Sequence, residues 1–314
     1  MRAVAVSEFG ATPEVMELPV PEAGPGQVLV RIHAAGLNPF DWQVGDGALR
    51  DALPHRFPLV LGMEGAGEVA ALGADVIGFA VGDRVFGEFL RVKSGGGSYG
   101  EYAVADAGAL ARIPDAVSYT DAAVLAVAGT TALNLVEGTH VAPGQTVLIV
   151  GATGGVGTFA TQLAAARGAH VIATARPDAA ESMRALGAEE TVDHTAGPVA
   201  ERVLARYPHG VDVLIDVASD KAALVAVAAA VRWGGAVGVS TWAADPEALA
   251  ARDIRAFNLD NRPTAEVLAR VADDVAAGRL RVTVDGTVPL AEAPAALARS
   301  RAGRARGKTV IAVA

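Results

Sequence analysis

Residues 146–175 read TVLIVGATGGVGTFATQLAAARGAHVIATA, and this stretch decides the fold class. The apolar segment TVLIV is followed by three glycines spaced three apart, Gly151, Gly154 and Gly157, and then by a helix-forming run that ends near Arg167. A second apolar segment, HVIATA, comes next. A strand, a glycine turn, a helix and a second strand in this order predict a βαβ unit whose turn binds a dinucleotide.

The glycine turn suits a pyrophosphate for a local reason. Without a Cβ the backbone approaches the phosphates closely, and the unpaired N–H groups at the start of the helix favour their negative charge. We therefore expect the turn, with Gly154, Gly155 and Val156, to bind the cofactor.

The end of the second strand bears on which dinucleotide is bound. An NAD site usually has an Asp or Glu there, which accepts a hydrogen bond from the ribose 2′-hydroxyl. This chain has Thr174, Ala175 and Arg176 instead. Because a guanidinium pairs with a 2′-phosphate that a carboxylate would repel, we predict NADPH. The alternative is that Arg176 is only an exposed loop residue, and Asp178 keeps an NAD site open.

Length and composition limit the possible classes of protein. A chain of 314 residues, of which 52% are hydrophobic, fits two domains. No apolar run is long enough to span a bilayer and no secretory signal is evident, so we expect a cytoplasmic protein without a membrane partner. The absence of Cys excludes disulfides and zinc sites that use sulfur.

The charge of the chain bears on its partners. A net charge of −9 argues against a nucleic-acid partner, and we expect the basic segment 299–308 to be a solvated helix end.

The amino-acid composition and the hydrophobic pattern change twice along the chain. Residues 1–118 are rich in Gly and Pro and contain short alternating apolar segments, which predict an antiparallel, mainly β domain. Residues 119–262 alternate apolar strands with helices and predict a parallel sheet that is buried on both faces, with a helix over 221–234 and a strand over 235–240. Residues 263–314 resemble residues 1–118 in this pattern, so we expect the α/β domain to be inserted into the mainly β domain.

Further motifs accompany the glycine turn: AAGLNPFDW (34–42), GMEGAGEV (62–69), GDRV (82–85), GGSYGEYA (96–103), AVAGTTAL (126–133) and RGKTVI (306–311). Along its whole length the chain resembles the zinc-independent quinone oxidoreductases, the zeta-crystallin-like family of the medium-chain dehydrogenase/reductase superfamily. The resemblance implies a Rossmann-type cofactor domain inserted in a GroES-like catalytic domain. It also implies hydride transfer from NADPH to a small-molecule quinone or α,β-unsaturated carbonyl.

Two loops depart from the zinc-dependent members of this superfamily, which carry a Cys in the early loop and a His–Glu pair in the glycine turn that follows. This chain has Asn38 in the first loop and Met63–Glu64 in the second, so we expect no catalytic metal. By resemblance, the side-chain amide of Asn38 is the predicted catalytic group, a donor near the nicotinamide and the substrate. The alternative is an Asn that holds the turn before Pro39.

The predicted cofactor contacts are Asn38, Thr130, Gly154, Gly155, Val156, Thr174, Arg176, His194, Ser240 and Arg262. Of these, Thr130 is alternatively a helix cap, and Arg262 stands at a spacing shorter than the family's. The family also implies a homodimer that forms through an edge strand, here expected at 254–260. Two other functions stay open: an enoyl-thioester or biosynthetic enone reductase, and an NADPH-binding sensor or structural protein with little turnover.

Overall fold

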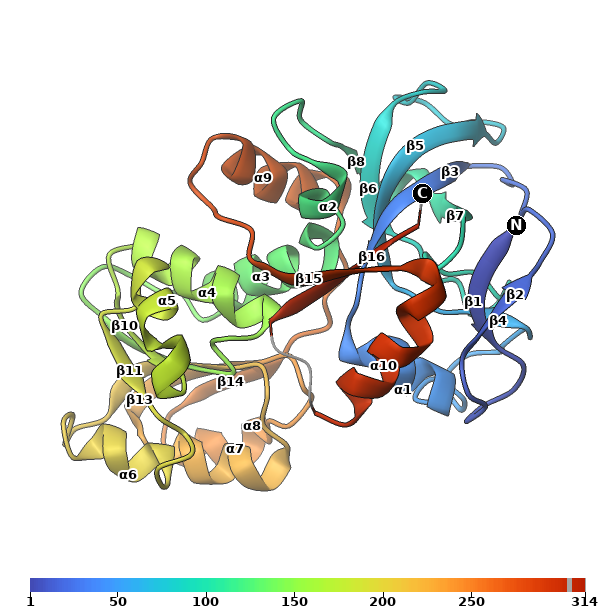
Figure 1. Cartoon of the computed structure of the whole chain (residues 1–314). Helices are drawn as coiled ribbons and strands as arrows, with labels where there is room; N and C mark the ends of the chain where they lie inside the picture. Colours follow the sequence, from blue (N-terminus) through green and yellow to red (C-terminus); the bar gives the residue numbers. More distant parts are fainter. Residues whose placement is uncertain (304–306, 314) are drawn as a thin grey trace. The chain divides into compact units, whose positions relative to one another are not determined.

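A computed structural model describes residues 1–303 and 307–313 of the chain (Figure 1). The chain forms two compact units, one made of Met1–Val127 with Pro263–Ala314 and the other of Ala128–Arg262. The second unit is therefore an insertion in the sequence of the first. Among the described residues, no helix is both long enough and apolar enough to cross a membrane.

The second unit is built on a six-stranded parallel sheet in the order β11-β10-β9-β12-β13-β14. Its strands are β9 (Thr146–Val150), β10 (His170–Thr174), β11 (Glu190–Val192), β12 (Val211–Asp216), β13 (Val231–Val239) and β14 (Arg255–Asn258). The strand order reverses between β9 and β12, which pair directly. This arrangement confirms the predicted parallel sheet, and ligands of such sheets bind at the carboxyl ends of the strands where the order reverses.

Helices cover both faces of this sheet. Figure 1 shows α3 (Thr130–Gly138) and α4 (Gly155–Ala166) on one side, and α6 (Val199–Leu204) and α7 (Lys221–Ala228) on the other. The shorter helices α5 (Ala180–Ala185) and α8 (Pro246–Ala250) follow β10 and β13. Burial on both faces explains why the strands are apolar throughout rather than alternating.

The boundary between α7 and β13 differs from the prediction of a helix over 221–234. The helix ends at Ala228 and β13 already begins at Val231, which pairs with Val211 of β12. Both Ala230 and Val231 are buried in the core of the unit. Pairing with the neighbouring strand therefore overrides the helix propensity of the alanine-rich sequence.

The first unit contains a seven-stranded sheet in the order β15-β16-β3-β5-β6-β8, with β7 also paired to β3, and a three-stranded sheet in the order β2-β1-β4. Most neighbours in these sheets are antiparallel, as predicted, whereas β15 and β16 are parallel. The strands are β1 (Arg2–Val6), β2 (Glu14–Glu17), β3 (Gln27–Gly36), β4 (Leu59–Val60), β5 (Glu64–Leu72), β6 (Arg84–Glu88), β7 (Tyr102–Asp106), β8 (Leu110–Arg112), β15 (Val284–Pro289) and β16 (Lys308–Ala312).

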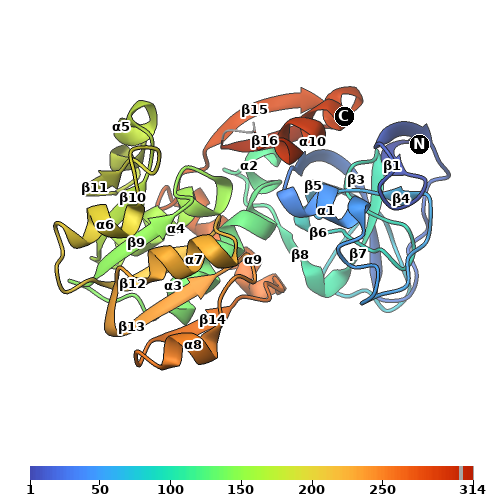
Figure 2. The same cartoon turned by 90° about the horizontal axis from the view of Figure 1, so that it is seen from below.

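The described residues of the first unit form the α-helices α1 (Pro39–Asp46), α2 (Tyr119–Ala122), α9 (Ala265–Ala276) and α10 (Ala293–Arg301). Helix α10 lies alongside β15, as Figure 2 shows, and also packs against α1. Helix α2 belongs here because the ring of Tyr119 stacks on His33 at 4.4 Å and its hydroxyl donates to Glu68. Residues 119–127, which we expected to open the inserted domain, thus cluster with the first unit.

Strand β3 pairs with strands from both the N-terminal and the C-terminal part of the first unit. It pairs with β5 along most of its length and with β16 at its end, where Gly36 lies opposite both Glu64 and Val310. Just beyond this point, the Leu37 N–H donates to the Thr309 carbonyl at 2.9 Å. This pairing brings the start of β16 beside the loop that leads into α1.

The core of the second unit yields a prediction about stability. Leu148 of β9 is fully buried and lies opposite Leu214 and Ile172. We expect Leu148→Ala to lower the free energy of unfolding by about 2–5 kcal/mol in urea titrations, because the change leaves a cavity. The control Val225→Ala, at a side chain that is 74% exposed on α7, should change it by no more than about 0.5 kcal/mol. Equal losses for the two variants would contradict the assignment of this core.

Candidate active site

Asn38 lies at the junction between β3 and α1. It is the N-cap of the helix, with extended backbone angles, and Pro39 takes the first helical position. The carboxylate of Asp41 accepts a hydrogen bond from the Asn38 N–H at 2.7 Å, which fixes the backbone of the turn. The residue is only 7% exposed. The backbone thus serves the turn before Pro39 and leaves the side-chain amide for other contacts.

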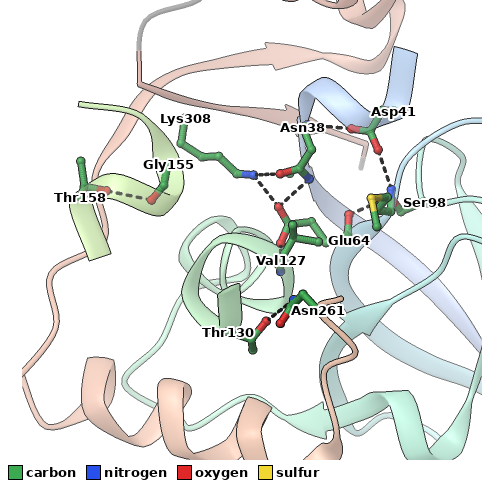
Figure 3. A network of polar contacts seen from close by, with 12 residues as sticks. Asn38, Asp41, Glu64, Ser98, Val127, Thr130, Gly155, Thr158, Asn261 and Lys308 are labelled. Carbon is green, nitrogen blue, oxygen red and sulfur yellow. Dashed lines mark hydrogen bonds and ion pairs between the residues drawn. The ribbon is translucent and has the colours of Figure 1, made fainter. Parts of the chain in front are cut away.

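That amide belongs to a buried polar cluster with Glu64 and Lys308 (Figure 3). Asn38 Nδ2 donates to Glu64 Oε1 at 2.9 Å, and Lys308 Nζ donates to Asn38 Oδ1 at 2.6 Å. Lys308 Nζ also lies 2.5 Å from Glu64 Oε1. The other oxygen of Glu64 accepts from the Val127 N–H at 2.6 Å. We call these three side chains the Asn38–Glu64–Lys308 cluster.

The sheet of the first unit positions all three members of the cluster. Glu64 opens β5, Lys308 opens β16, and Asn38 follows β3, which pairs with both strands. Gly36 makes room for the carboxylate, because a Cβ there would lie 2.4 Å from Glu64 Oε1 and 2.6 Å from the Ala123 carbonyl oxygen. A glycine at the end of β3 is therefore a packing requirement of the cluster.

Asp41 ties the start of α1 to the loop before β5. In addition to the Asn38 N–H, its carboxylate accepts from the Met63 N–H at 2.9 Å and from the Tyr99 hydroxyl at 2.5 Å. Burial raises the pKa of Asp41 to about 6, against the opposing effect of the hydrogen bonds from Tyr99 and Asn38. Burial and the adjacent Asp41 carboxylate raise the pKa of Tyr99 well above its usual range.

In the second unit, the glycine turn has the geometry that a pyrophosphate site needs. Gly151 has a positive φ of 78°, which favours glycine. A Cβ on Gly157 would lie 2.3 Å from the Gly151 carbonyl oxygen, so the helix approaches the turn only because this residue has no side chain. A Cβ on Gly154 would meet a single described atom within 4 Å, the same carbonyl oxygen at 3.3 Å, and the space beside Gly154 is otherwise open.

The start of α4 offers free backbone donors at this turn. Gly154 is the N-cap and has no side chain to cap the helix. Within the described part of the chain, the N–H groups of Gly155, Val156 and Gly157 donate to no other residue. Three free donors at the positive end of a helix dipole, next to open space, fit the phosphates of a dinucleotide. Gly154, Gly155 and Val156 lie at this helix start, and their contact with a cofactor stays a prediction.

The other predicted cofactor contacts in this unit differ in their surroundings. Thr174, at the end of β10, is buried, and its hydroxyl accepts from the Gly151 N–H at 3.0 Å, so this side chain supports the turn. Arg176 is exposed two residues further on, and no described residue pairs with its guanidinium. His194 is exposed beyond β11, and Ser240 is half-buried just after β13.

Thr130 and Arg262 have different partners in the structure. Arg262 is exposed and pairs with Asp260 at 2.8 Å. Its neighbour Asn261 bonds Thr130, because Asn261 Nδ2 donates to Thr130 Oγ1 at 2.9 Å, and Asn261 Oδ1 accepts from Asn134 Nδ2 at 2.9 Å. Asn261 was not predicted from the sequence. The only signal for it was its position next to Arg262, a candidate cofactor contact.

Sequence reasoning also missed three buried charged residues. We interpreted Glu64 only as part of an incomplete metal set, and we placed Lys308 in a solvated segment. That expectation is wrong for Lys308, which is 4% exposed, although the end of α10 at 299–303 is largely exposed as expected; residues 304–306 of the segment lie outside the described residues. The third is Asp216 at the end of β12, a fully buried carboxylate whose Oδ2 has no partner among the described residues. A charged residue at the start or end of an apolar strand was the available signal.

Metal ligation requires several donors converging on one point. In residues 1–303 and 307–313, no three His, Asp or Glu side chains gather closely enough to hold an ion. The side chain at position 38 is an amide that is already held by Glu64 and Lys308.

Comparison with known proteins identifies the class to which this fold and these sites belong. Residues 24–115 match the alcohol dehydrogenase GroES-like domain, and residues 186–311 match the zinc-binding dehydrogenase family. The solved structure of the quinone oxidoreductase from Coxiella burnetii superposes with a TM-score of 0.89 at 29% identity, covering 100% of this chain and 99% of that one. The predicted fold class, a Rossmann-type unit inserted in a GroES-like unit, is confirmed.

Similar sequences show to which family within this class the chain belongs. It is 30% identical to the chloroplast envelope quinone oxidoreductase homolog of Arabidopsis thaliana, over 99% of this chain and 98% of the relative. It is 31% identical to the mitochondrial NAD(P)H oxidoreductase RTN4IP1 of Mus musculus, over 92% of this chain and 82% of the relative. The protein is a medium-chain dehydrogenase/reductase. Within that superfamily it belongs to the quinone oxidoreductase family, whose members are oxidoreductases that use a nicotinamide cofactor.

The raised pKa of Asp41 yields a prediction about pH and stability. Between the ordinary value of 3.8 and the folded value of about 6, the folded protein keeps a proton that the unfolded chain releases. The stability that this group contributes is therefore full below pH 3.8 and is lost as the pH rises through 6. We expect the unfolding free energy of the wild type, relative to Asp41→Asn, to fall by roughly 3 kcal/mol across this window in urea titrations. A difference that does not vary with pH would contradict the raised pKa.

Proposed function

We propose that this protein reduces quinones or α,β-unsaturated carbonyls by hydride transfer from NADPH, without zinc. The observation that carries this proposal is the buried amide of Asn38, a neutral hydrogen-bond donor at the place where zinc-dependent members of the superfamily have a metal-binding Cys. A neutral donor suits a substrate whose carbonyl oxygen gains charge as hydride adds to a conjugated carbon. Oxidation of an alcohol, by contrast, needs a base that takes the hydroxyl proton or a metal ion that makes this proton more acidic.

Each residue has a defined part in this reaction. The nicotinamide supplies a hydride to the β-carbon of the conjugated system when the cofactor is bound. The N–H groups of Gly155, Val156 and Gly157 bind the pyrophosphate. Asn38 Nδ2 donates a hydrogen bond to the substrate oxygen, on which negative charge develops, and solvent delivers the proton that completes the reduction.

Preference for NADPH is proposed from the end of β10. Arg176 is exposed there, and its guanidinium is uncommitted among the described residues, so it is free to pair with a 2′-phosphate. Asp178, two residues later, is the feature that an NADH-dependent enzyme would use instead. A cytoplasmic location stays a prediction. So does a homodimer formed through β14, the edge strand of the six-stranded sheet.

A second candidate function is the reduction of enoyl thioesters. The polyketide synthase GfsB of Streptomyces halstedii is 35% identical over 92% of this chain, which spans 5% of that protein. The hydride chemistry is the same, and the two functions differ in the group attached to the carbonyl. A third candidate, an NADPH-binding sensor, would bind the cofactor without turnover.

One assay separates these functions. NADPH oxidation is followed by its absorbance against a panel of quinones, simple enones and enoyl-CoA thioesters, before and after dialysis against a strong chelator. We expect turnover with quinones or enones that the chelator does not change. Turnover with thioesters alone would favour the second candidate, and tight NADPH binding without turnover would favour the sensor. Activity that the chelator abolishes and zinc restores would overturn the zinc-free mechanism.

Asn38→Ala tests the donor role. Removing one preorganised donor from a developing oxyanion lowers turnover by roughly 10²-fold to 10³-fold in well-defined cases. Since water also donates here, we expect kcat to fall by about tenfold or more, with the Kd of NADPH nearly unchanged. Gln43→Ala, on the same helix, is the control and should retain activity. An unchanged kcat for Asn38→Ala would assign this residue to the turn before Pro39.

Arg176→Glu tests the cofactor preference. The substitution replaces a donor to the 2′-phosphate with a charge that repels it, so we expect the affinity for NADPH to fall by about tenfold or more and the affinity for NADH to change little. Titration calorimetry with each cofactor measures both. Arg184→Glu on α5 makes the same change of charge at another exposed site and serves as the control. Parallel losses for NADPH and NADH would rule out Arg176 as the discriminating residue.

A further inference from the structure

We infer that Lys308 is a positioning residue, which holds the amide of Asn38 in the one orientation that presents a hydrogen-bond donor to the substrate. This inference rests on the proposed reduction of a carbonyl compound. It adds to that proposal a residue from the far end of the chain, 270 positions from Asn38.

The donor and acceptor properties of the cluster determine the orientation of the amide. A lysine ammonium group only donates hydrogen bonds, and a carboxylate only accepts them. Lys308 therefore faces the oxygen of Asn38, and Glu64 faces its nitrogen, as the distances of 2.6 Å and 2.9 Å show. A flipped amide would place N–H groups against the ammonium and oxygen against the carboxylate, so both contacts would be repulsive.

One donor remains free in this orientation. The Nδ2 atom of Asn38 carries two protons, of which one goes to Glu64. No described residue accepts the second, and the oxygen of the amide is occupied by Lys308. The group that Asn38 offers to a ligand is therefore an N–H, which suits a substrate that accepts a hydrogen bond.

Lys308 is buried, unlike the other lysines of the chain. Of the three lysines of the chain, Lys93 and Lys221 are exposed, whereas the side chain of Lys308 is 5% exposed. Transferring an ammonium group out of water is unfavourable, and an ion pair in such a place is often no more stabilising than well-packed apolar side chains. Because Glu64 balances the charge at 2.5 Å, the pair adds no net charge to the site. The two charges do, however, determine which way the amide of Asn38 is turned.

A purely structural role is the rival explanation, since the same bonds join β16 to β3 and β5. The variant that separates the two roles is Lys308→Met combined with Glu64→Gln. It leaves no unpaired buried charge, and the new Gln keeps an oxygen for the Val127 N–H. With that oxygen on the Val127 N–H, the NH2 group of the new Gln faces Asn38 and can only donate, so the amide of Asn38 turns its oxygen toward position 64 and loses its wild-type orientation.

We expect this double variant to retain a Tm and an NADPH Kd close to those of the wild type while its kcat falls by about tenfold with KM nearly unchanged. Lys308→Gln combined with Glu64→Gln again offers a hydrogen-bond donor on the side of the amide that Lys308 faces and should recover part of the lost kcat. Lys93→Met is the control for the loss of a lysine and should match the wild type. A kcat within about twofold of the wild type in the first double variant, with the wild type active, would overturn the inference.

A spectroscopic measurement tests the orientation without any substrate. In protein labelled with ¹⁵N at asparagine side chains, the Asn38 signal is assigned by its loss in Asn38→Ala. We expect one of its two Nδ2 protons to exchange slowly with solvent in the wild type and both to exchange rapidly in the first double variant. Equal exchange in the two proteins would overturn the inference. Absence of turnover in the wild type would instead count against the proposed function, and this measurement would still decide the orientation.

Discussion

The pairing of β16 with the end of β3 is the constraint on which the proposed catalytic site depends. Strand β3 also pairs with β5, so Gly36 lies opposite Glu64 on one side and Val310 on the other. These two pairings hold Glu64 and Lys308 against the loop that carries Asn38. A shift of one residue in either register would turn the charged side chain to the opposite face of the sheet.

The two units offer ligands different kinds of polar group. The second unit uses backbone groups, because glycines keep the start of α4 open and its free N–H groups favour phosphate charge. The first unit uses side chains in a buried network, in which each polar group has a partner of opposite character. Asp41 adjoins this network through the Asn38 N–H, and its raised pKa reflects the burial of its carboxylate.

The sequence predicted more of the fold than of the cluster. The glycine turn, the parallel sheet and the mainly β unit were all predicted, because local spacing and periodicity determine them. The start of β13 at Val231 was not, since pairing with β12 overrode a helical sequence. Asn261, which bonds Thr130, was not predicted either, because its partner lies 131 residues away in the chain and no local pattern records it.

By itself, the sequence determined that a dinucleotide turn lies between a buried strand and a helix, and that the chain has no Cys to hold a metal. Those features depend on residues close together in the chain. Only the tertiary structure decided that Lys308 is buried against Asn38 and Glu64. Its charge predicted exposure, and no local pattern records a partner 270 residues away, because long-range strand pairing alone brings the two together.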